Sequence, residues 1–138
     1  MAKTIRLDIV TPEKVSYSED VNMVIARTTG GDIGVLPGHA PLIAGLAIWP
    51  LRVQKEEGEV QLAVCGGFIE VTPEKVTVLG NCVELAEDID IIRAEKAKER
   101  AEARLRSPEE IDVARAEAAL KRAMARLKAA ENNKNNKM

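Results

Sequence analysis

Hydrophobic and polar side chains alternate along the first half of the chain. Ile5, Leu7 and Ile9 are separated by Arg6 and Asp8, so one side of this segment is apolar and the other is polar. The same two-residue period recurs in two further runs, residues 60–64 and 76–78. Because successive side chains of a β-strand point to opposite faces, this period predicts strands with one buried face.

Turn-forming residues interrupt these runs. They occur at Thr11-Pro12, Gly30-Gly31, Pro37-Gly38, Pro50, Gly66-Gly67 and Thr72-Pro73. Lys55-Glu56-Glu57-Gly58 lies between two runs and predicts a hairpin connection. The pattern predicts roughly eight to ten short strands with no helix between them, which is typical of an antiparallel β-sandwich or flattened barrel.

Small apolar residues recur at helical spacing in the second half. Between Ile89 and Leu105 they are Ala94, Ala97 and Ala101. From residue 113 onward apolar side chains step by three and four, which is the narrow seam of paired helices: Val113, Ala116, Leu120, Ala123, Leu127 and Ala130. The sequence therefore predicts an α+β protein, an N-terminal antiparallel β-sandwich followed by a C-terminal antiparallel hairpin of two helices.

A capping box separates the two predicted helices. Ser107 suits the N-cap, Pro108 the first helical position and Glu110 the third, so the second helix is expected to start here. All nine glycines lie at or before Gly80, so the chain after residue 80 is built differently from the part before it. The predicted divisions are residues 1–86 (sandwich), 87–131 (helical hairpin) and 132–138 (a frayed or disordered tail).

The seam of the hairpin is dominated by alanine. Each methylene that alanine lacks relative to leucine forgoes about 0.8 kcal/mol of burial. The two helices can therefore approach closely, but they gain little stability from burying this seam. The pattern favours a hairpin that is only marginally stable and can open. The alternative is that the hairpin simply packs against the sandwich, and the pattern leaves both open.

Composition and charge narrow the classes of function that the chain can have. The 138 residues carry a net charge of −2, which argues neither for nor against nucleic acid, but the basic C-terminal half has no aromatic residue to stack on bases. No uninterrupted run of about 18 apolar residues occurs, and the N-terminus has no apolar stretch of a secretory signal. We expect Cys65 and Cys82 to be reduced, buried small hydrophobic residues of a cytosolic protein.

Arginines gather beside the two helical seams. On helices at 100° per residue they form two stripes on the same face of the hairpin: Arg93, Arg100 and Arg104, then Arg115, Arg122 and Arg126. Counting from a turn at Ser107, Arg93 lies opposite Arg122, and Arg100 lies opposite Arg115. Converging guanidinium groups repel each other unless an anion separates them, which favours a polyanion site. The alternative is a solvated face neutralised by Glu99, Glu102 and Glu117.

Catalytic and metal motifs are absent from the sequence. There is no phosphate-binding Gly-x-x-x-x-Gly-Lys-Ser/Thr loop and no Gly-x-Ser-x-Gly nucleophile elbow. Two cysteines and one histidine cannot build a zinc site without carboxylates. His39 is the only histidine and is interpreted as a turn or contact residue. We expect no enzyme centre and no bound metal.

Four segments closely resemble the epsilon subunit of bacterial rotary ATP synthases. They are Gly31–Leu42 (GDIGVLPGHAPL), Gly66–Leu79 (GGFIEV and VTVL), Asp88–Ala94 (DIDIIRA) and Arg115–Ala123 (RAEAALKRA). They occur in order, and the resemblance extends from Thr4 to Ala130. It implies a non-catalytic rotor subunit whose sandwich binds the gamma subunit and the membrane c-ring, followed by a mobile two-helix domain.

The resemblance also implies roles for individual residues. Ile89-Asp90-x-x-Arg93-Ala94 is similar to the ATP-binding motif of Bacillus-type epsilon subunits, which places regulatory ATP contacts on Glu84, Ile89, Asp90, Arg93, Ala94, Arg100, Arg122 and Arg126. Asp32 and His39 are expected in an exposed loop region at the stalk and c-ring interface. Inhibitory contacts to the beta subunits of the alpha/beta catalytic hexamer are expected from Arg115, Lys121, Arg122 and Arg126.

The resemblance implies that the chain requires no cofactor, with ATP only a regulatory ligand, and that it inhibits ATP hydrolysis. It also implies a peripheral position on the cytoplasmic face of the bacterial plasma membrane, in a complex that by family default transports protons, and no nucleic-acid partner. The alternative function is a stand-alone nucleotide-sensing regulatory module, which shares the helical site but does not need the surface of the sandwich. A third possible function is that of an enzyme.

Overall fold

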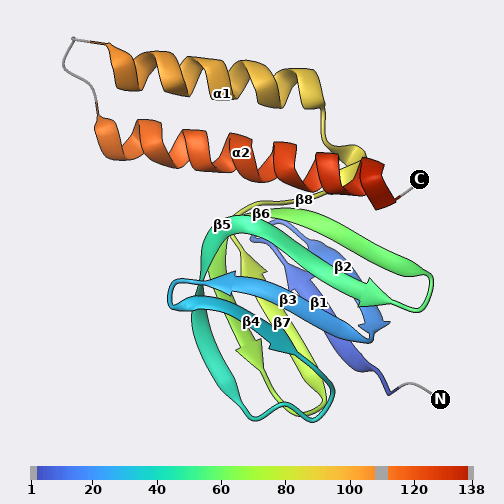
Figure 1. The fold of residues 1–138 in the computed structure, drawn as a ribbon. Helices are drawn as coiled ribbons and strands as arrows, with labels where there is room; N and C mark the ends of the chain where they lie inside the picture. The colour runs from blue at the N-terminus through green and yellow to red at the C-terminus, as the bar shows by residue number, and fades with distance from the viewer. Residues whose placement is uncertain (1–2, 108–111, 137–138) are drawn as a thin grey trace.

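The computed structural model describes residues 3–107 and 112–136 of the chain. Eight strands form the N-terminal part of the described residues (Figure 1). Their bounds are β1 Ile5–Val10, β2 Val15–Val21, β3 Met23–Thr28, β4 Gly31–Val35, β5 Leu42–Lys55, β6 Gly58–Val71, β7 Lys75–Gly80 and β8 Val83–Leu85. The predicted hairpin connection is confirmed, since β5 ends at Lys55 and β6 begins at Gly58.

The strands are hydrogen-bonded in the order β2-β1-β7-β6-β5-β3-β4, with β8 added on β6. The sheet folds over on itself, so that β3, β4 and β5 face the layer of β1, β2 and β7 (Figure 1). All pairings are antiparallel except that of β1 with β7, which is parallel. The predicted α+β fold with an N-terminal sandwich is confirmed, with this one parallel pair inside it.

Two of the strands are much longer than the sequence pattern suggested. β5 and β6 have 14 residues each and run through positions that were interpreted as turns, Pro50 and Gly66-Gly67. Pro50 lies where the register between β3 and β5 is interrupted, so a residue without an N–H is tolerated there. Gly66 and Gly67 have positive φ angles of 96° and 136°, and a Cβ on Gly67 would collide with the backbone oxygen of Leu79. The glycines therefore bend β6 against β7 and do not end the strand.

The alternating apolar residues of the strands form the core. Ile5, Leu7 and Ile9 of β1 are fully buried, as are Leu62 of β6 and Val76 of β7. The alternation of buried and more exposed positions confirms the period-two interpretation for β1 and β7. It does not hold for residues 60–64 of β6, where Gln61 and Ala63 are also buried.

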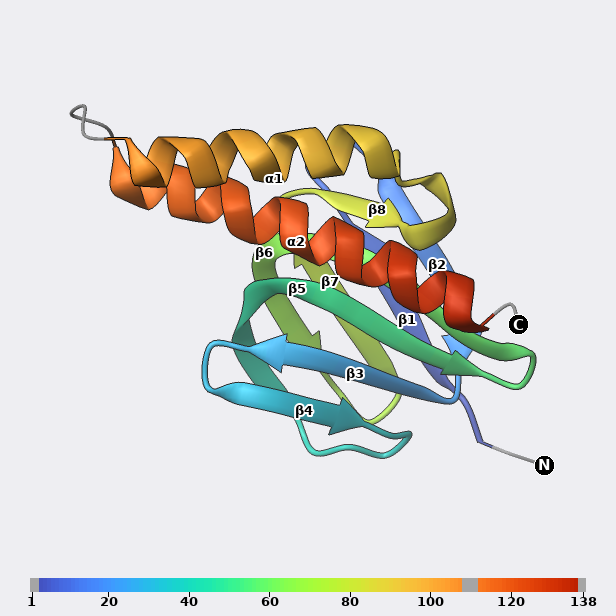
Figure 2. The ribbon, with the colours of Figure 1, turned by 45° about the horizontal axis from the view of Figure 1, so that its top comes forward.

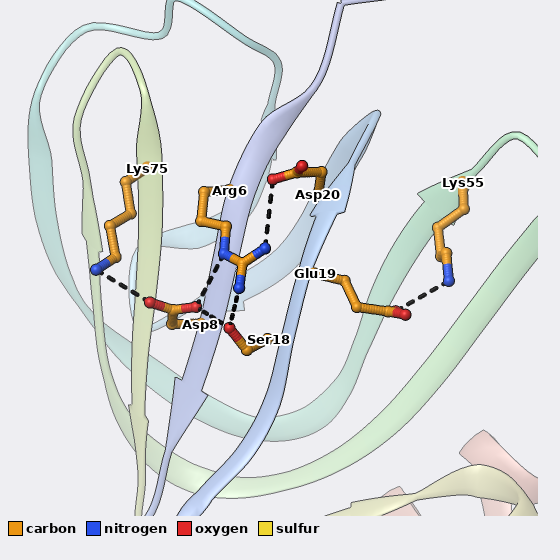
Figure 3. Close-up of polar contacts among 7 residues, drawn as sticks. All are labelled: Arg6, Asp8, Ser18, Glu19, Asp20, Lys55 and Lys75. Atoms are coloured by element: carbon orange, nitrogen blue, oxygen red, sulfur yellow. Dashed lines mark hydrogen bonds and ion pairs between the residues drawn. The ribbon is translucent and has the colours of Figure 1, made fainter.

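Polar side chains on the outer face of β1 bind it to both of its neighbours (Figure 3). Asp8 accepts a hydrogen bond from Ser18 Oγ at 2.6 Å and pairs with Lys75 Nζ at 3.0 Å, so one carboxylate joins β2, β1 and β7. The hydrogen bond from Ser18 and the nearby Lys75 lower the pKa of Asp8. Arg6 completes the cluster with ion pairs to Asp8 at 3.4 Å and Asp20 at 3.5 Å.

Two helices follow a single 3-10 turn, η1 Ala86–Asp88. Helix α1 spans Ile91–Arg106 and α2 spans Val113–Asn136. Among the described residues, neither helix is long and apolar enough to cross a membrane.

The helix ends differ from the predicted capping box. Ser107 is the C-cap of α1, while Pro108 and Glu110 lie outside the described residues. Asp112 instead accepts a hydrogen bond from the backbone N–H of Arg115 at 3.1 Å, just before α2 begins at Val113. Within the described residues α2 therefore begins at Val113, and the predicted start at residue 108 lies outside them.

Helix α2 lies between α1 and the sandwich (Figures 1 and 2). Ala116 and Ala123 of its predicted seam are buried, as are Ala94 and Ala101 of α1, so small residues bring the helices close together. Ala129 and Ala130 pack with Ala63 of β6, Ala86 of η1 and Ile89 in a second apolar cluster. In this structure the hairpin is formed and packs against the sandwich, whereas its ability to open stays a prediction.

The end of α2 also differs from the prediction of a frayed tail. The helix continues through Asn136, and Asn132 Nδ2 donates to Gln61 Oε1 of β6 at 3.1 Å. This contact gives the Asn-rich segment a polar partner on the sheet, which extends the helix beyond its apolar pattern.

The cysteines are not reduced as expected. Cys65 of β6 and Cys82, which lies between β7 and β8, form a disulfide with a Cα–Cα distance of 5.3 Å. Both are half-buried. Sequence spacing gave no sign of this pairing, because the folding of β6, β7 and β8 brings the two residues together.

Candidate functional site

A polar cavity of about 370 Å³ lies where β8, η1 and the two helices meet. It is lined by Glu84, Asp88, Asp90, Arg93, Ala94, Ala97, Arg100 and Arg126. Glu84 comes from β8 and Asp88 from η1, whereas the arginines come from both helices. Residues separated by 42 positions therefore form one site.

Three guanidinium groups and three carboxylates line this cavity. Arg93 and Arg100 lie seven residues apart on α1, a spacing of about two turns that puts them on one face. Within residues 3–107 and 112–136, neither of these two arginine side chains forms an ion pair, and both are exposed. They can therefore donate hydrogen bonds to an added anion, and planar guanidinium groups suit the oxygens of phosphate.

Arg126 is held in place by a carboxylate of the sheet. Its Nε donates to Glu84 Oε1 at 2.7 Å, and its side chain is only 28% exposed. This ion pair joins α2 to β8 and turns the guanidinium toward the cavity. Because both partners are partly shielded from water, the contact is stronger than an open surface pair.

Asp90 has a structural role that the resemblance did not indicate. It is the N-cap of α1, and its Oδ1 accepts a hydrogen bond from the backbone N–H of Arg93 at 3.1 Å. An N-cap of this type contributes about 1 kcal/mol to helix stability. The cap also sets the first turn of α1, and with it the position of Arg93.

The structure brings together most of the predicted ATP contacts, but not all of them. Glu84, Asp90, Arg93, Ala94, Arg100 and Arg126 line the cavity. Ile89 does not, since it is buried in the apolar cluster beneath α2. Arg122 lines a separate small cavity with Glu84, Arg126 and the two cysteines.

The predicted register of the hairpin was also wrong. Counting from Ser107 placed Arg93 opposite Arg122 and Arg100 opposite Arg115. The observed helix ends, Arg106 and Val113, place Arg93 level with Arg126, and the cavity holds Arg126 together with Arg93. The later start of α2 moves its arginines along the hairpin by about one helical turn. Arg104 and Arg115 are exposed and do not line the cavity.

Sequence reasoning missed two residues of the cavity. Ala97 lies three residues after Ala94, so it shares the same face of α1 and could have been found from helical spacing. Asp88 lies in η1, whose turn places it beside the site. No pattern in the sequence indicated that turn.

Asp32 and His39 do not share one exposed loop as expected. Asp32 lies in β4, is exposed and pairs with Arg27 Nε at 2.8 Å. The hydrogen bond from Arg27 lowers the pKa of Asp32, and Arg27 in turn stacks on Trp49 at 3.9 Å from the ring centre. His39 follows β4 in a loop and is half-buried, with its Nδ1 2.6 Å from the carbonyl oxygen of Ala40.

The four residues predicted to make inhibitory contacts differ in exposure. Arg115 and Lys121 are exposed on α2, whereas Arg122 and Arg126 are half-buried against the sandwich. Only part of the basic surface of α2 is therefore accessible while the hairpin is docked.

Two family models match the chain over nearly its whole length. The first, described as "ATP synthase, Delta/Epsilon chain, beta-sandwich domain", matches residues 4–86. The second, described as "ATP synthase, Delta/Epsilon chain, long alpha-helix domain", matches residues 87–131.

Curated relatives are similar over about three quarters of the chain. The ATP synthase epsilon chain of Pelotomaculum thermopropionicum is 55% identical over 103 residues, which cover 75% of this chain and 77% of that protein. The epsilon chain of Alkalihalophilus pseudofirmus is 50% identical over 104 residues, 75% of this chain and 78% of its own. The Bacillus subtilis epsilon chain is 47% identical over 105 residues, 76% and 80% of the two chains.

A solved structure with a similar chain extends the comparison. A chain in the mitochondrial ATP synthase of Euglena gracilis, in an assembly of OSCP, F1 and c-ring, superposes with a TM-score of 0.80 and 31% identity, covering 93% of this chain and 81% of that one. A chain in the central stalk and c-ring of the Tetrahymena thermophila enzyme has a TM-score of 0.52 at 12% identity, which shows a shared fold alone.

Proposed function

This chain belongs to the ATP synthase delta/epsilon family, as an epsilon subunit of the bacterial type, and from that premise we propose how its two parts work. The sandwich couples the gamma subunit to the c-ring. The helical hairpin binds ATP as a regulatory ligand, and when it opens it inhibits ATP hydrolysis by the alpha/beta hexamer.

The main support for ATP binding is the polar cavity at the base of the hairpin. Arg93 and Arg100 are without ion-pair partners among the described residues, and with Arg126 they offer donors to a polyphosphate from both helices. Ala94 and Ala97 form a wall with short side chains, which leaves room for a ribose or a base. A volume of about 370 Å³ falls in the range of small-molecule sites.

Binding of this kind stabilises the closed hairpin. A ligand that contacts α1 through Arg93 and α2 through Arg126 binds only when the helices lie side by side. It therefore stabilises the closed form by RT ln(1 + [L]/Kd). The alanine seam on its own contributes little burial, so this added stability can decide the balance.

The open hairpin presents charges that the closed form holds against the sandwich. Arg122 and Arg126 are half-buried when α2 is docked and become available with Arg115 and Lys121 when it leaves. The resulting basic helix is suited to acidic surface on the beta subunits, where an inserted helix blocks rotation in the hydrolysis direction. The same arginines then bind nucleotide in one state and carboxylates in the other, so ATP shifts the balance by its differential affinity.

The surface of the sandwich supports a role in the rotor. Ile43, Phe68 and Leu79 are exposed at neighbouring positions of β5, β6 and β7, with 72%, 60% and 50% of each residue accessible. Contiguous apolar side chains on an outer face mark protein contacts. We assign this face to the gamma subunit, and the exposed Asp32 to the contact with the c-ring and stalk.

The chain does not hydrolyse ATP in this proposal. No cofactor is required, and the nucleotide acts by holding the helices together. The subunit is peripheral, on the cytoplasmic face of the plasma membrane, in a complex that transports protons.

A probe pair across the hairpin tests the ATP site. Labels on the outer faces of α1 and α2 should report closure when ATP is added, and Arg93→Ala should remove the response. Arg104→Ala, an exposed arginine of the same helix outside the cavity, is the matched control. Equal closure of wild type and Arg93→Ala at the same ATP concentration contradicts the assignment.

Size-exclusion chromatography with purified gamma subunit tests the rotor role. A stable complex at micromolar concentrations is expected. Its absence favours the alternative of a stand-alone nucleotide-sensing module, which needs only the helices.

A further inference from the structure

The disulfide lies directly beneath the docked helix. Cys65, Cys82 and Ala125 line a cavity of only about 10 Å³, with Arg122 and Arg126 at the same place. That volume does not exceed what a single water molecule requires. Ala125 is only 1% exposed, so α2 packs closely over this part of the sheet.

The disulfide is not needed to hold its two strand segments together. The backbone N–H of Cys65 already donates to the carbonyl oxygen of Cys82 at 3.1 Å. β6 is also paired with β7 on one side of Cys82 and with β8 on the other. Breaking the S–S bond therefore leaves the sheet intact and changes mainly the surface against which α2 packs.

Arg126 connects the disulfide to the polar cavity. Its Nη2 lies 4.0 Å from Cys82 Sγ, while its Nε pairs with Glu84 at 2.7 Å. One guanidinium group therefore contacts the sulfur, the carboxylate of β8 and the cavity lined by Arg93 and Arg100.

We propose that Cys65 and Cys82 are a redox pair whose oxidation state controls the docking of α2 on the sandwich. The effect on nucleotide binding rests on the function proposed above, whereas the effect on docking does not. Oxidation favours the docked helix, and reduction loosens it.

The reaction is a thiol–disulfide exchange with a small dithiol. Two electrons and two protons pass from the dithiol to Cys65 and Cys82, which become thiols, and the dithiol becomes a disulfide. A low-molecular-weight disulfide reverses the step. The S–S bond between the cysteines breaks as an S–S bond forms in the exchange partner.

Reduction changes both the packing under α2 and the surroundings of Arg126. Two thiol sulfurs stand farther apart than two bonded ones, and the cavity of about 10 Å³ beneath Ala125 leaves little room for them. Reduction also frees Cys82 Sγ from the S–S bond beside Arg122 and Arg126. Movement of this sulfur changes its contact with Arg126, which also pairs with Glu84.

The first measurement is the state of the cysteines. The full chain is equilibrated with mixtures of reduced and oxidised dithiothreitol, alkylated with N-ethylmaleimide under denaturing conditions and weighed by mass spectrometry. A chain that gains no adduct on the oxidised side and two on the reduced side supports the proposal. Two adducts under every mixture overturn it.

The second measurement is the docking of α2 without nucleotide. Trp49 is the only tryptophan, and it lines a cavity with Lys121 and Met124 of α2, so its emission reports the docked helix. Reduction should shift the Trp49 emission and increase amide hydrogen exchange in the second half of α2 several-fold. The double variant Cys65→Ser, Cys82→Ser should show no response to dithiothreitol. Identical emission and exchange in the oxidised and reduced wild type overturn the proposal.

Titration of ATP into the two forms separates this inference from the proposed function. We expect the reduced chain to bind ATP about threefold or more weakly than the oxidised chain. Equal affinity in both forms, or tighter binding by the reduced form, overturns the link to the nucleotide site. If neither form binds ATP while Trp49 still responds to reduction, the proposed nucleotide function fails and the redox control of docking is supported.

Discussion

Arg126 of α2 donates from Nε to Glu84 Oε1 of β8 at 2.7 Å, across 42 positions of the sequence. The pair joins the last helix of the chain to the last strand of the sheet. It holds the docked hairpin and also delivers an arginine to the cavity at its base. A change at this contact should therefore affect both ligand binding and docking.

Replacing Arg126 by alanine should weaken ATP binding by about tenfold to a hundredfold, since a hydrogen bond to a charged group is worth about 1.5–3 kcal/mol. Isothermal titration of ATP into the isolated chain measures the effect. Arg104→Ala, which removes an exposed arginine outside the cavity, should leave the affinity within about twofold. Equal losses in the two variants would mean that only the overall charge matters.

Truncating the chain after Ala86 should increase ATP hydrolysis by the assembled complex, because the inhibitory helices are removed while the sandwich stays. Replacing Arg115, Arg122 and Arg126 together by alanine should do nearly the same. Steady-state hydrolysis with and without the truncation checks this, with subunit composition as the control for assembly. A truncated complex that hydrolyses ATP no faster than the intact one shows that the helices are not inhibitory.

Asp32→Lys should weaken the coupling between proton flow and ATP synthesis without unfolding the sandwich. The carboxylate is exposed on β4, and the change sets a lysine beside Arg27. Synthesis driven by a proton gradient in vesicles is the measurement, and Glu56→Lys, at the exposed β5–β6 turn, is the charge-matched control. A large fall in melting temperature with normal assembly would show that Asp32 is structural.

Asp8 makes the stability of the sandwich depend on pH. Its pKa is lower in the folded chain than in the unfolded one, so it stabilises the fold above the ordinary value near 3.8. This contribution is lost as the pH falls through the lowered folded value. Asp8→Asn should cost about 1 kcal/mol at pH 7, and the difference from wild type should shrink below about pH 4. Urea unfolding at several pH values measures it, and a constant difference at all pH values would exclude the carboxylate charge as the cause.

Gly67→Ala should destabilise the sandwich by about 3 kcal/mol or more, because the new Cβ collides with the Leu79 carbonyl and the φ of 136° is unfavourable for alanine. Gly30→Ala is the control, since its Cβ would meet only Thr28 Oγ1 at 3.8 Å, an ordinary contact. Its cost should stay within about 1 kcal/mol. Denaturant unfolding compares the two, and equal effects would show that β6 relaxes at Gly67.

Local patterns predicted the fold class well. The period of two in β1 and the three-and-four spacing of the helices each depend only on which side of an element is buried, so they can be seen in the sequence. Most residues of the polar cavity could also be named in advance. Their spacing on α1, and the resemblance of the segment around Asp90 to a known motif, pointed to one face of one helix.

The tertiary structure decided which residues meet across elements. Alanines occur on several faces of α2, so the sequence could not show that Ala125 and Ala129 face the sandwich while Ala116 and Ala123 lie in the seam of the hairpin. The length of the connection between the helices determines that Arg126, and not Arg122, lies level with Arg93. The disulfide between Cys65 and Cys82 and the continuation of β6 through Gly66-Gly67 likewise depend on neighbouring strands. The physical reason is common to all four: a sequence pattern records which side of an element avoids water, whereas the partner on that side is chosen by how distant elements pack.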